Sequence, residues 1–530
     1  MMHHRILISL VLLSVHLQFS YADDLYPEKI PGTLHLFGAN YLTPELRTDF
    51  VDTLSEKEPK LVVLLAPENE KVDLDARLAG WKHDKWASTK LVALKSADDA
   101  ENEENRKAIQ AASVLSIETG NLEILRKAFS SNKLRELLQA HVRAGKTILI
   151  EGAAAGLVGS LELSQTYPRI QTAPGLGLLE QFCVVPFAFS RDRLDILQQA
   201  MRLKPGYVGF GLDTNTYVRV NGRQIIVQGT TGAVVVQNDQ QRRVASTQVL
   251  GNRQFADIFA LRRTAYYRKT GTFPEKSPSP PEVKKGTLVI VGGGGTPPDA
   301  LKAFVEAAGG VEKQFVVVAT AYGDELPKKV FEVGMLRQAG VKNIHVLHTT
   351  SRTEANSEEF SKILTKTDGL WFSGGRHWRF IDSYADTLCE KRFREVLDRG
   401  GVIGGSSAGA SIQADYMPRA HPLGNLEIMA EGYEKGFGYL PGTAIDQHFF
   451  ARKRPKDMTY LMENHPQYLG IGLDEGTAII VRGTVCEVVG RSKVAFYDRS
   501  SLPPTATPDY LELKSGDRYD LKNRKQLPAK

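Results

Sequence analysis

The chain has 530 residues, of which 24% are charged and 42% hydrophobic, with 67 Lys and Arg against 61 Asp and Glu. These proportions are those of a folded protein with ample material for a core, and they exclude a collagen, a wholly disordered chain and a polytopic membrane protein. The net charge of +6 is not clustered in a basic stripe, so no nucleic-acid partner is expected. The three cysteines (Cys183, Cys389 and Cys486) are too few for a disulfide framework, and we expect them to be buried apolar residues.

The first residues have the pattern of a secretory signal peptide. A positively charged start at 1–5 precedes an apolar stretch at 6–17, and Ser20 and Ala22 place small residues at the −3 and −1 positions of a cleavage site. The apolar stretch is shorter than the ~20 residues that a membrane-spanning helix needs. We therefore expect residues 1–22 to be removed, and the mature protein to be secreted or periplasmic with no membrane partner.

A proline-rich stretch at 272–281 divides the chain into two related halves. Four prolines in ten residues indicate an exposed linker, because proline cannot sustain a helix or a central strand. On either side, residues 175–229 match 436–490 without a gap at a shift of 261. The segment that begins at Gly32 matches the one at Gly286, a shift of 254. We predict an internal duplication, with domains at 23–270 and 286–500, a linker at 271–285 and a C-terminal tail at 501–530.

Each copy has the pattern of an α/β domain. In the second copy, short apolar runs at 288–291, 315–319, 343–347 and 369–372 are separated by amphipathic stretches such as 298–308 and 328–339. Apolar strands that alternate with helices of this length indicate parallel βαβ units. We predict two tandem three-layer α/β/α domains with mostly parallel sheets, to which the Gly-, Thr- and Val-rich final third of each copy adds antiparallel strands.

The second copy contains a candidate nucleophile. Strand-like residues at 401–405 lead into Gly405-x-Ser407-x-Gly409, the spacing of a sharp strand-to-helix turn on which a serine is exposed and the glycines give the backbone room. The amide of Ala408, at the start of the following helix, could donate to an oxyanion. Ser406 is the rival nucleophile, but its frame places Ala408 where the second glycine should be.

A serine nucleophile needs a base and an acid that orients the base. The candidates are His448 and Glu475. At the equivalent positions the first copy has no group able to do this chemistry. It has Ala154 opposite Ser407, Phe187 opposite His448 and Thr214 opposite Glu475. Scaffold residues around these positions, such as Gly156 and Asp213, persist in the first copy. This pattern indicates that the first copy has lost a catalytic triad.

Three motifs in order, GGSSAGA, DQHFFARKR and GIGLDEGTA, resemble the cyanophycinase family of serine peptidases, which are relatives of aspartyl dipeptidase. The resemblance covers residues 286–497, and the first copy is a degenerate version of it. It implies a fold related to the class I glutamine amidotransferases. It also implies Ser407 as nucleophile, His448 as base, Glu475 as its acidic partner, and a role for Asp446 and Gln447 in binding substrate.

The sequence departs from this family after the strand at 369–372. The family has two glycines followed by aspartate and glutamine, whereas Gly374 and Gly375 are followed here by Arg376 and His377. A second oxyanion donor, the amide of Gly374 or Gly375, is therefore retained. The glutamine that helps to hold substrate is replaced by His377, which is therefore the candidate substrate contact at this position and leaves the identity of the substrate open.

These residues predict an exported serine hydrolase that cleaves aspartyl amide bonds. Arg376, Arg379, Arg452 and Arg454 could pair with aspartyl carboxylates, while a structural role stays open for Arg452 and Arg454 because their counterparts Arg191 and Arg193 persist in the first copy. By resemblance the substrate is cyanophycin, cleaved to β-Asp-Arg dipeptides. The alternatives are an aspartyl or isoaspartyl dipeptidase and a non-catalytic binding protein.

No cofactor or metal is expected. His421, His448 and His465 lack metal-ligand spacing, and Pro297 occupies the third-glycine position of a dinucleotide fingerprint after the glycine run at 292–295. The oligomeric state, including a homodimer, stays open.

Overall fold

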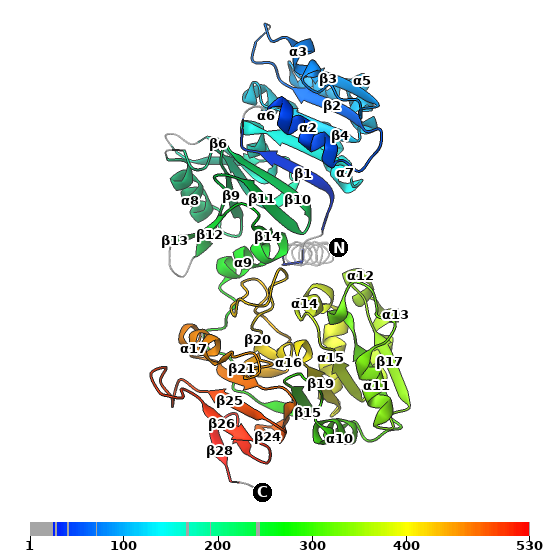
Figure 1. Ribbon diagram of the computed structural model, residues 1–530, viewed down its shortest axis with the longest axis vertical. Coiled ribbons are helices and arrows are strands. Elements are labelled where there is room, and N and C mark those ends of the chain that lie inside the picture. Colours follow the sequence, from blue (N-terminus) through cyan, green and yellow to red (C-terminus); the bar gives the residue numbers. More distant parts are fainter. Residues whose placement is uncertain are drawn as a thin grey trace, which may run out of the picture. The chain divides into compact units, whose positions relative to one another are not determined.

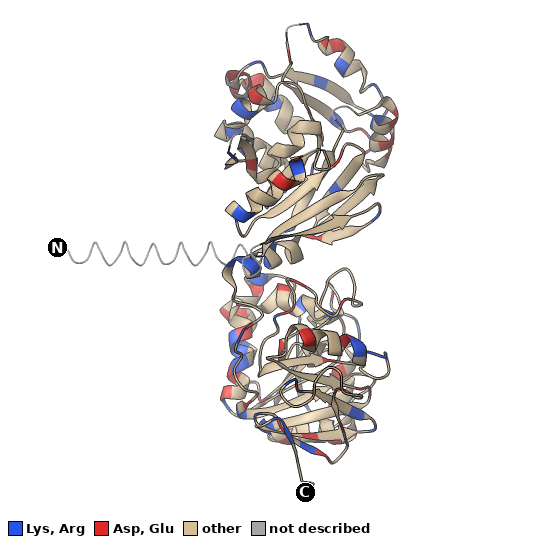
Figure 2. Cartoon of the chain, turned by 90° about the vertical axis from the view of Figure 1, so that its left-hand side faces the viewer, with Lys and Arg blue, Asp and Glu red and all other residues tan. Residues whose placement is uncertain are grey.

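The computed structural model describes residues 25–26, 29–39, 42–69, 71–165, 169–190, 192–239 and 244–528. The predicted signal peptide, residues 1–22, lies outside these residues. The chain forms two compact units that divide between Gly271 and Thr272. Within the described ranges, no helix has both the length and the apolar character needed to cross a membrane. In the view of Figure 2, positive and negative residues are interspersed over each unit.

The first unit contains two sheets (Figure 1). The larger has eight strands in the order β14-β11-β10-β1-β5-β4-β2-β3, of which β1, β5, β4, β2 and β3 are parallel. The smaller has six strands in the order β13-β12-β9-β8-β6-β7. The strands are β1 (Ile30–Phe37), β2 (Lys60–Leu65), β3 (Ser88–Ala93), β4 (Val114–Glu118), β5 (Thr147–Glu151), β6 (Gly159–Gln165), β7 (Gln171–Pro174), β8 (Leu179–Pro186), β9 (Val208–Leu212), β10 (Thr216–Gly222), β11 (Gln224–Gly229), β12 (Ala233–Asp239), β13 (Val244–Leu250) and β14 (Phe255–Asp257). The helices are α2 (Pro44–Thr53), α3 (Leu74–Ala79), α4 (Ala97–Glu101), α5 (Glu103–Ala111), α6 (Leu122–Phe129), α7 (Asn132–Arg143), the 3-10 helix η1 (Gly152–Leu157), α8 (Arg193–Leu203) and α9 (Ile258–Thr270).

The second unit also contains two sheets. The larger has nine strands in the order β17-β16-β18-β19-β15-β23-β24-β27-β28, with β17, β16, β18, β19 and β15 parallel. The smaller has the order β20-β21-β22-β25-β26. The strands are β15 (Val283–Val291), β16 (Gln314–Val318), β17 (Asn343–Leu347), β18 (Gly369–Phe372), β19 (Val402–Ser406), β20 (Ala414–Tyr416), β21 (Leu440–Asp446), β22 (Leu469–Leu473), β23 (Thr477–Gly483), β24 (Val485–Gly490), β25 (Lys493–Tyr497), β26 (Leu511–Lys514), β27 (Arg518–Asp520) and β28 (Lys525–Leu527). The helices are α10 (Pro298–Ala307), η2 (Thr320–Tyr322), α11 (Phe331–Gln338), α12 (Arg352–Ala355), α13 (Glu358–Ser361), η3 (Lys362–Lys366), α14 (Trp378–Tyr384), α15 (Leu388–Asp398), α16 (Ala408–Ser411) and α17 (Pro455–Asn464).

Helices cover both faces of the large sheet in the second unit. Trp371 and Phe372 are neighbours on β18, so their side chains point to opposite faces. The ring of Trp371 contacts Phe304 of α10, and the ring of Phe372 contacts Phe393 of α15. These contacts place α10 and α15 in different layers. The predicted α/β fold with mostly parallel sheets is confirmed, and the antiparallel strands of each final third are present.

The two units share a strand order. In the larger sheets, β3-β2-β4-β5-β1-β10-β11-β14 corresponds to β17-β16-β18-β19-β15-β23-β24-β27. Residues with positive φ also recur at a shift of 261; these pairs are Gly177 and Gly438, Gln181 and Gly442, Phe187 and His448, Asp192 and Lys453, Gly222 and Gly483, and Gly229 and Gly490. Both observations support the predicted duplication, which stays a prediction.

The segments expected to be a linker and a tail belong largely to the second unit. Phe273 is buried against Tyr416, the Glu275 amide donates to the hydroxyl of Tyr468, and β15 starts at Val283. Residues 501–530 contribute β26, β27 and β28 to the two sheets. The sequence did not show this because these strands are only three or four residues long. The three cysteines are free and buried, as expected.

Candidate active site

Ser407 occupies a sharp turn between β19 and α16. Its φ of 56° and ψ of −110° are unusual for a residue with a side chain, and its amide donates to the Val291 carbonyl at 3.0 Å. A Cβ at Gly405 would lie 2.2 Å from the Gly409 carbonyl oxygen, and one at Gly409 would lie 2.1 Å from the Phe372 carbonyl oxygen. The two glycines therefore have the spatial role that the motif predicted. The helix that follows the turn is only four residues long.

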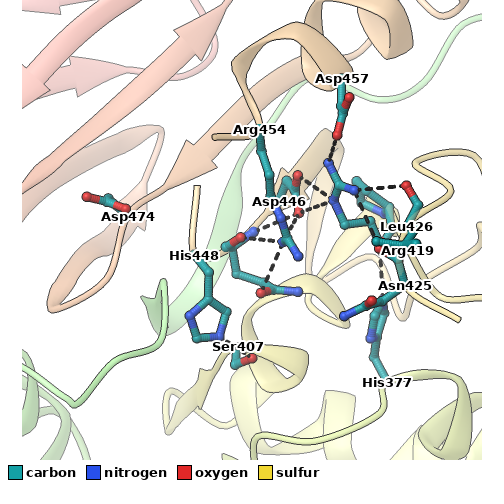
Figure 3. Close-up of polar contacts among 12 residues, drawn as sticks. His377, Ser407, Arg419, Asn425, Leu426, Asp446, His448, Arg454, Asp457 and Asp474 are labelled. Carbon is teal, nitrogen blue, oxygen red and sulfur yellow. Dashed lines mark hydrogen bonds and ion pairs between the residues drawn. The ribbon is translucent and has the colours of Figure 1, made fainter. Parts of the chain in front are cut away.

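His448 connects Ser407 to Glu475. The Oγ of Ser407 lies 2.9 Å from His448 Nε2, and His448 Nδ1 lies 2.6 Å from Glu475 Oε1. The Glu475 carboxylate can only accept, so Nδ1 carries the proton and Nε2 is left to accept from the serine hydroxyl. Figure 3 shows the imidazole of His448 directed at Ser407. The three residues predicted to form a triad are thus brought together from three separate loops in the arrangement of a nucleophile, a base and an orienting acid.

A glycine loop after β15 packs against this relay. The His448 amide donates to the Gly292 carbonyl at 2.8 Å. A Cβ at Gly293 would lie 2.3 Å from His448 Cε1, and one at Gly294 would lie 2.6 Å from Glu475 Cβ. Sequence reasoning considered this glycine run only as a nucleotide-binding motif. The signal in the sequence was the run of consecutive glycines, because residues without a side chain allow another segment of the chain to pack closely against the backbone.

Burial lowers the pKa of His448 below its usual 6.5. The hydrogen bond that His448 donates to Glu475 raises this pKa, and the charges of Arg452 and Arg454 lower it further. The imidazole is therefore neutral at neutral pH and can accept a proton.

Two backbone amides near Ser407 are available as oxyanion donors. The Ala408 amide is the first of α16, and no hydrogen bond to it or to the Gly375 amide is found among the described residues. The Gly374 amide, by contrast, donates to Glu332 Oε1 at 3.3 Å. Glu332 is buried, which raises its pKa, and it also accepts from the hydroxyl of Tyr322 at 2.8 Å. Of the two predicted glycines, Gly375 therefore has the free donor.

Asp446 lies in a buried ion cluster. Its carboxylate accepts from Arg454 Nη1 at 2.8 Å and from Arg419 Nε at 3.0 Å (Figure 3). Arg419 also pairs with Asp457 at 2.5 Å. Asp446 is fully buried, and its carboxylate and the Arg454 guanidinium neutralise each other inside the protein. The roles of these two residues in binding substrate stay predictions. Sequence reasoning missed Arg419, which carries no local motif.

Arg376 and His377 hold the loop that follows β20. His377 is 3% exposed and its Nε2 lies 2.8 Å from the Pro418 carbonyl, while Arg376 Nη2 donates to the Gly424 carbonyl at 3.0 Å. Burial lowers the pKa of His377 to about 4, so it donates as a neutral imidazole. The side chain of His377 is enclosed by protein, and its role in binding substrate stays a prediction.

The remaining predicted contact residues differ in their surroundings. Arg379 pairs with Asp324 and stacks on the ring of Trp378 at 4.6 Å. Gln447 is 6% exposed and its Oε1 accepts from Arg454, whereas Arg452 is exposed beside the His448 turn. Roles in substrate binding for Arg376, Arg379, Gln447 and Arg452 stay predictions.

Asp474 fixes the turn that follows the base. Its carboxylate accepts from the amides of Phe450 and Ala451 at 3.0 and 2.8 Å and from the hydroxyl of Ser492 at 2.6 Å. Because Glu475 is the next residue, one short segment both holds the histidine turn and supplies the orienting acid. No group of three or more His, Cys, Asp or Glu side chains able to hold a metal occurs among the residues that the structure describes.

The second unit is similar in sequence to known peptidases. Residues 283–489 match the model of peptidase family S51. A cyanophycinase from Geminocystis herdmanii is 27% identical over 245 residues, which cover 43% of this chain and 90% of the relative. A cyanophycinase from Nostoc sp. is 26% identical over 273 residues, covering 47% and 90% of the two chains. The crystal structure of a peptidase from an acI-B1 Actinobacterium is similar at 25% identity over 44% of this chain and 97% of that one, with a TM-score of 0.36.

The predicted resemblance to the cyanophycinase family is confirmed by these matches. The chain carries a serine-type peptidase domain in its second unit. The matched range begins with β15 and ends in β24, so it contains Ser407, His448 and Glu475.

Proposed function

We propose that the serine-type peptidase domain of residues 283–489 hydrolyses aspartyl amide bonds through Ser407, His448 and Glu475. The observation that carries the proposal is the continuous relay from Ser407 Oγ to His448 Nε2 at 2.9 Å and from His448 Nδ1 to Glu475 Oε1 at 2.6 Å. In this arrangement the serine is activated by a base whose tautomer and orientation are fixed by the acid.

In the proposed reaction, His448 Nε2 takes the proton of the Ser407 hydroxyl as Oγ bonds to the amide carbonyl carbon. The oxyanion that forms accepts hydrogen bonds from the Ala408 and Gly375 amides. The C–N bond then breaks, and His448 gives its proton to the leaving amine while Glu475 stabilises the imidazolium. Water, deprotonated by His448, attacks the acyl-enzyme and releases the acid product and the free serine.

Cyanophycin is the substrate we propose. The proposal is supported by two curated relatives that are cyanophycinases, because this chain matches about nine-tenths of the length of each. The products of the reaction would be β-Asp-Arg dipeptides. An aspartyl or isoaspartyl dipeptidase is the second candidate. It is favoured by Arg376 and His377, which anchor the residue 418–424 loop, because a differently held loop changes which substrate fits beside the nucleophile.

We also propose that the protein is exported and that the first unit is a duplicate without catalytic groups. The signal-peptide pattern at residues 1–22 supports export. The shared strand order and the recurring positive-φ positions support the duplication.

The test is to replace each of two adjacent serines separately. Purified Ser407→Ala is expected to lose dipeptide release from cyanophycin by a factor of at least about 10³, and to lose labelling by a fluorophosphonate. Ser406→Ala is the matched control, since it removes the same hydroxyl one residue earlier, and it should keep activity within about threefold. If Ser407→Ala is as active as the unmodified chain, the proposal fails. A panel with β-Asp-Arg and α-aspartyl dipeptides decides between the two substrate candidates.

A further inference from the structure

The first unit retains a pocket where the catalytic residues are missing. This pocket of about 220 Å³ is lined by the turn that follows β5, the end of β8 and the first residues of α6 and α8. Its lining includes Ala153 and Phe187, the counterparts of Ser406 and His448 in the second unit. Phe187 has a φ of 59° and His448 a φ of 49°, so both residues have the left-handed backbone conformation that is unusual for a residue with a side chain.

Arg193 lines this pocket and has lost the partner that its counterpart retains. Its counterpart Arg454 pairs with Asp446 at 2.8 Å in the second unit. At the shift of 261, the residue opposite Asp446 is Val185, which also lines the pocket. Among the residues that the structure describes, no hydrogen bond or ion pair to the Arg193 guanidinium is found. A guanidinium is charged at any physiological pH, so this pocket contains a positive charge without a protein counter-charge.

The other charged groups near the pocket do not remove this charge. Arg126 lies on the lining and its Nε is 3.5 Å from Glu162 Oε2, so these two largely cancel. Asp192 and Asp195, the sequence neighbours of Arg193, are exposed. Arg193 is also the first residue of α8, and among the described residues no side chain caps that helix, so the positive end of the helix dipole lies at the same place.

The rest of the lining is mostly apolar. Besides the two arginines and Ser164, it consists of Leu122, Ala153, Gly156, Leu157, Leu163, Val184, Val185, Pro186 and Phe187. We infer that the first unit is a binding site for a small carboxylate with a short apolar tail, whose carboxylate pairs with Arg193 while its tail packs on Val185 and Phe187. The volume suits a ligand of about ten heavy atoms or fewer.

Calorimetric titration of the full-length protein with 4-methylpentanoate tests this inference. Saturable binding is expected, and 4-methylpentanamide, which has the same shape without the charge, should bind at least about tenfold more weakly. Arg193→Gln should weaken binding of the acid by at least about tenfold, and Arg193→Lys should restore part of it because the charge is kept. Arg202→Gln, at an exposed position on the same helix, is the matched control and should leave binding unchanged.

A second variant acts by adding the missing acid. Val185→Asp places a carboxylate where the second unit has Asp446, so it should occupy Arg193 and abolish binding of the acid. The inference is overturned if acid and amide bind equally, if Arg193→Gln binds like the unmodified chain, or if no saturation is seen up to ~10 mM. Binding that persists in Arg193→Gln would place the ligand elsewhere, including at Ser407. None of these outcomes depends on turnover by the second unit.

Discussion

Replacing Gly293 with alanine should disconnect the base from the nucleophile without altering a catalytic residue. The new Cβ would lie 2.3 Å from His448 Cε1 and 2.6 Å from His448 Nε2, whereas ordinary van der Waals contact begins at 3.4 Å. The ring therefore has to recede by about 1 Å, the difference between these distances. That displacement disrupts the 2.9 Å hydrogen bond to Ser407. A misplacement of about 1 Å typically costs about 10² in rate.

Gly295→Ala is the control, because it separates the contact with His448 from backbone strain. Gly293 has a φ of 101° and Gly295 a φ of 102°, so alanine meets the same conformational penalty, about 1–3 kcal/mol, at both positions. No atom lies within 4 Å of a Cβ built at Gly295. The contribution of backbone strain to the loss of thermal stability should therefore be similar in the two variants.

Activity should differ between the two variants. Gly293→Ala is expected to lose about 10² in kcat/KM for dipeptide release from cyanophycin and in the rate of fluorophosphonate labelling, while Gly295→Ala stays within about threefold of the unmodified chain. The labelling rate reports on the activation of Ser407 and does not depend on the identity of the substrate. Equal activity in the two variants, at similar stability, would refute the role assigned to the glycine loop.

Three further predictions concern the relay and the ion cluster. Glu475→Gln should lower kcat by about 10²–10⁴, because an amide cannot stabilise the imidazolium; an unchanged kcat would show that the acid is not part of the mechanism. The lowered pKa of His448 predicts that kcat/KM rises with pH through an inflection below 6.5. Arg452→Gln should move that inflection to higher pH, because the substitution removes a positive charge that disfavours the imidazolium. A shift of the inflection to lower pH in the pH–rate profile would contradict this. Asp446→Asn should lower the free energy of unfolding by about 3–5 kcal/mol in urea titrations, because it leaves the buried guanidinium groups of Arg419 and Arg454 without their counter-charge. A decrease of less than about 1 kcal/mol would mean that water reaches this ion cluster.

The sequence by itself determined the fold class and the relay. Apolar runs of four or five residues between amphipathic stretches specify parallel strands with covering helices, since both faces of such a strand must be buried. Gly405, Ser407 and Gly409 could be recognised from spacing alone because their geometry is local. His448 and Glu475 stood out by comparison with the first copy, which retains the scaffold around both positions and has Phe187 and Thr214 in their place.

The roles of the charged residues were decided only by the tertiary structure. An arginine at the surface and an arginine in a buried pair have the same one-dimensional pattern, because ion pairing depends on which side chains the fold brings within about 4 Å. Arg419 and Asp446 are 27 residues apart, one in the loop after β20 and the other at the end of β21, yet they share one buried contact. Likewise, Arg376 and His377 looked like substrate contacts next to Gly375, but their hydrogen bonds go to the carbonyls of the residue 418–424 loop.

The first unit also combines features of both kinds. Its sequence shows that the three catalytic groups are absent, which follows from residue identity alone. That Arg193 and Val185 line one pocket there requires knowledge of which side chains meet in space. Local chemistry is encoded by neighbouring residues, whereas charge balance and enclosure are properties of residues that only folding brings together.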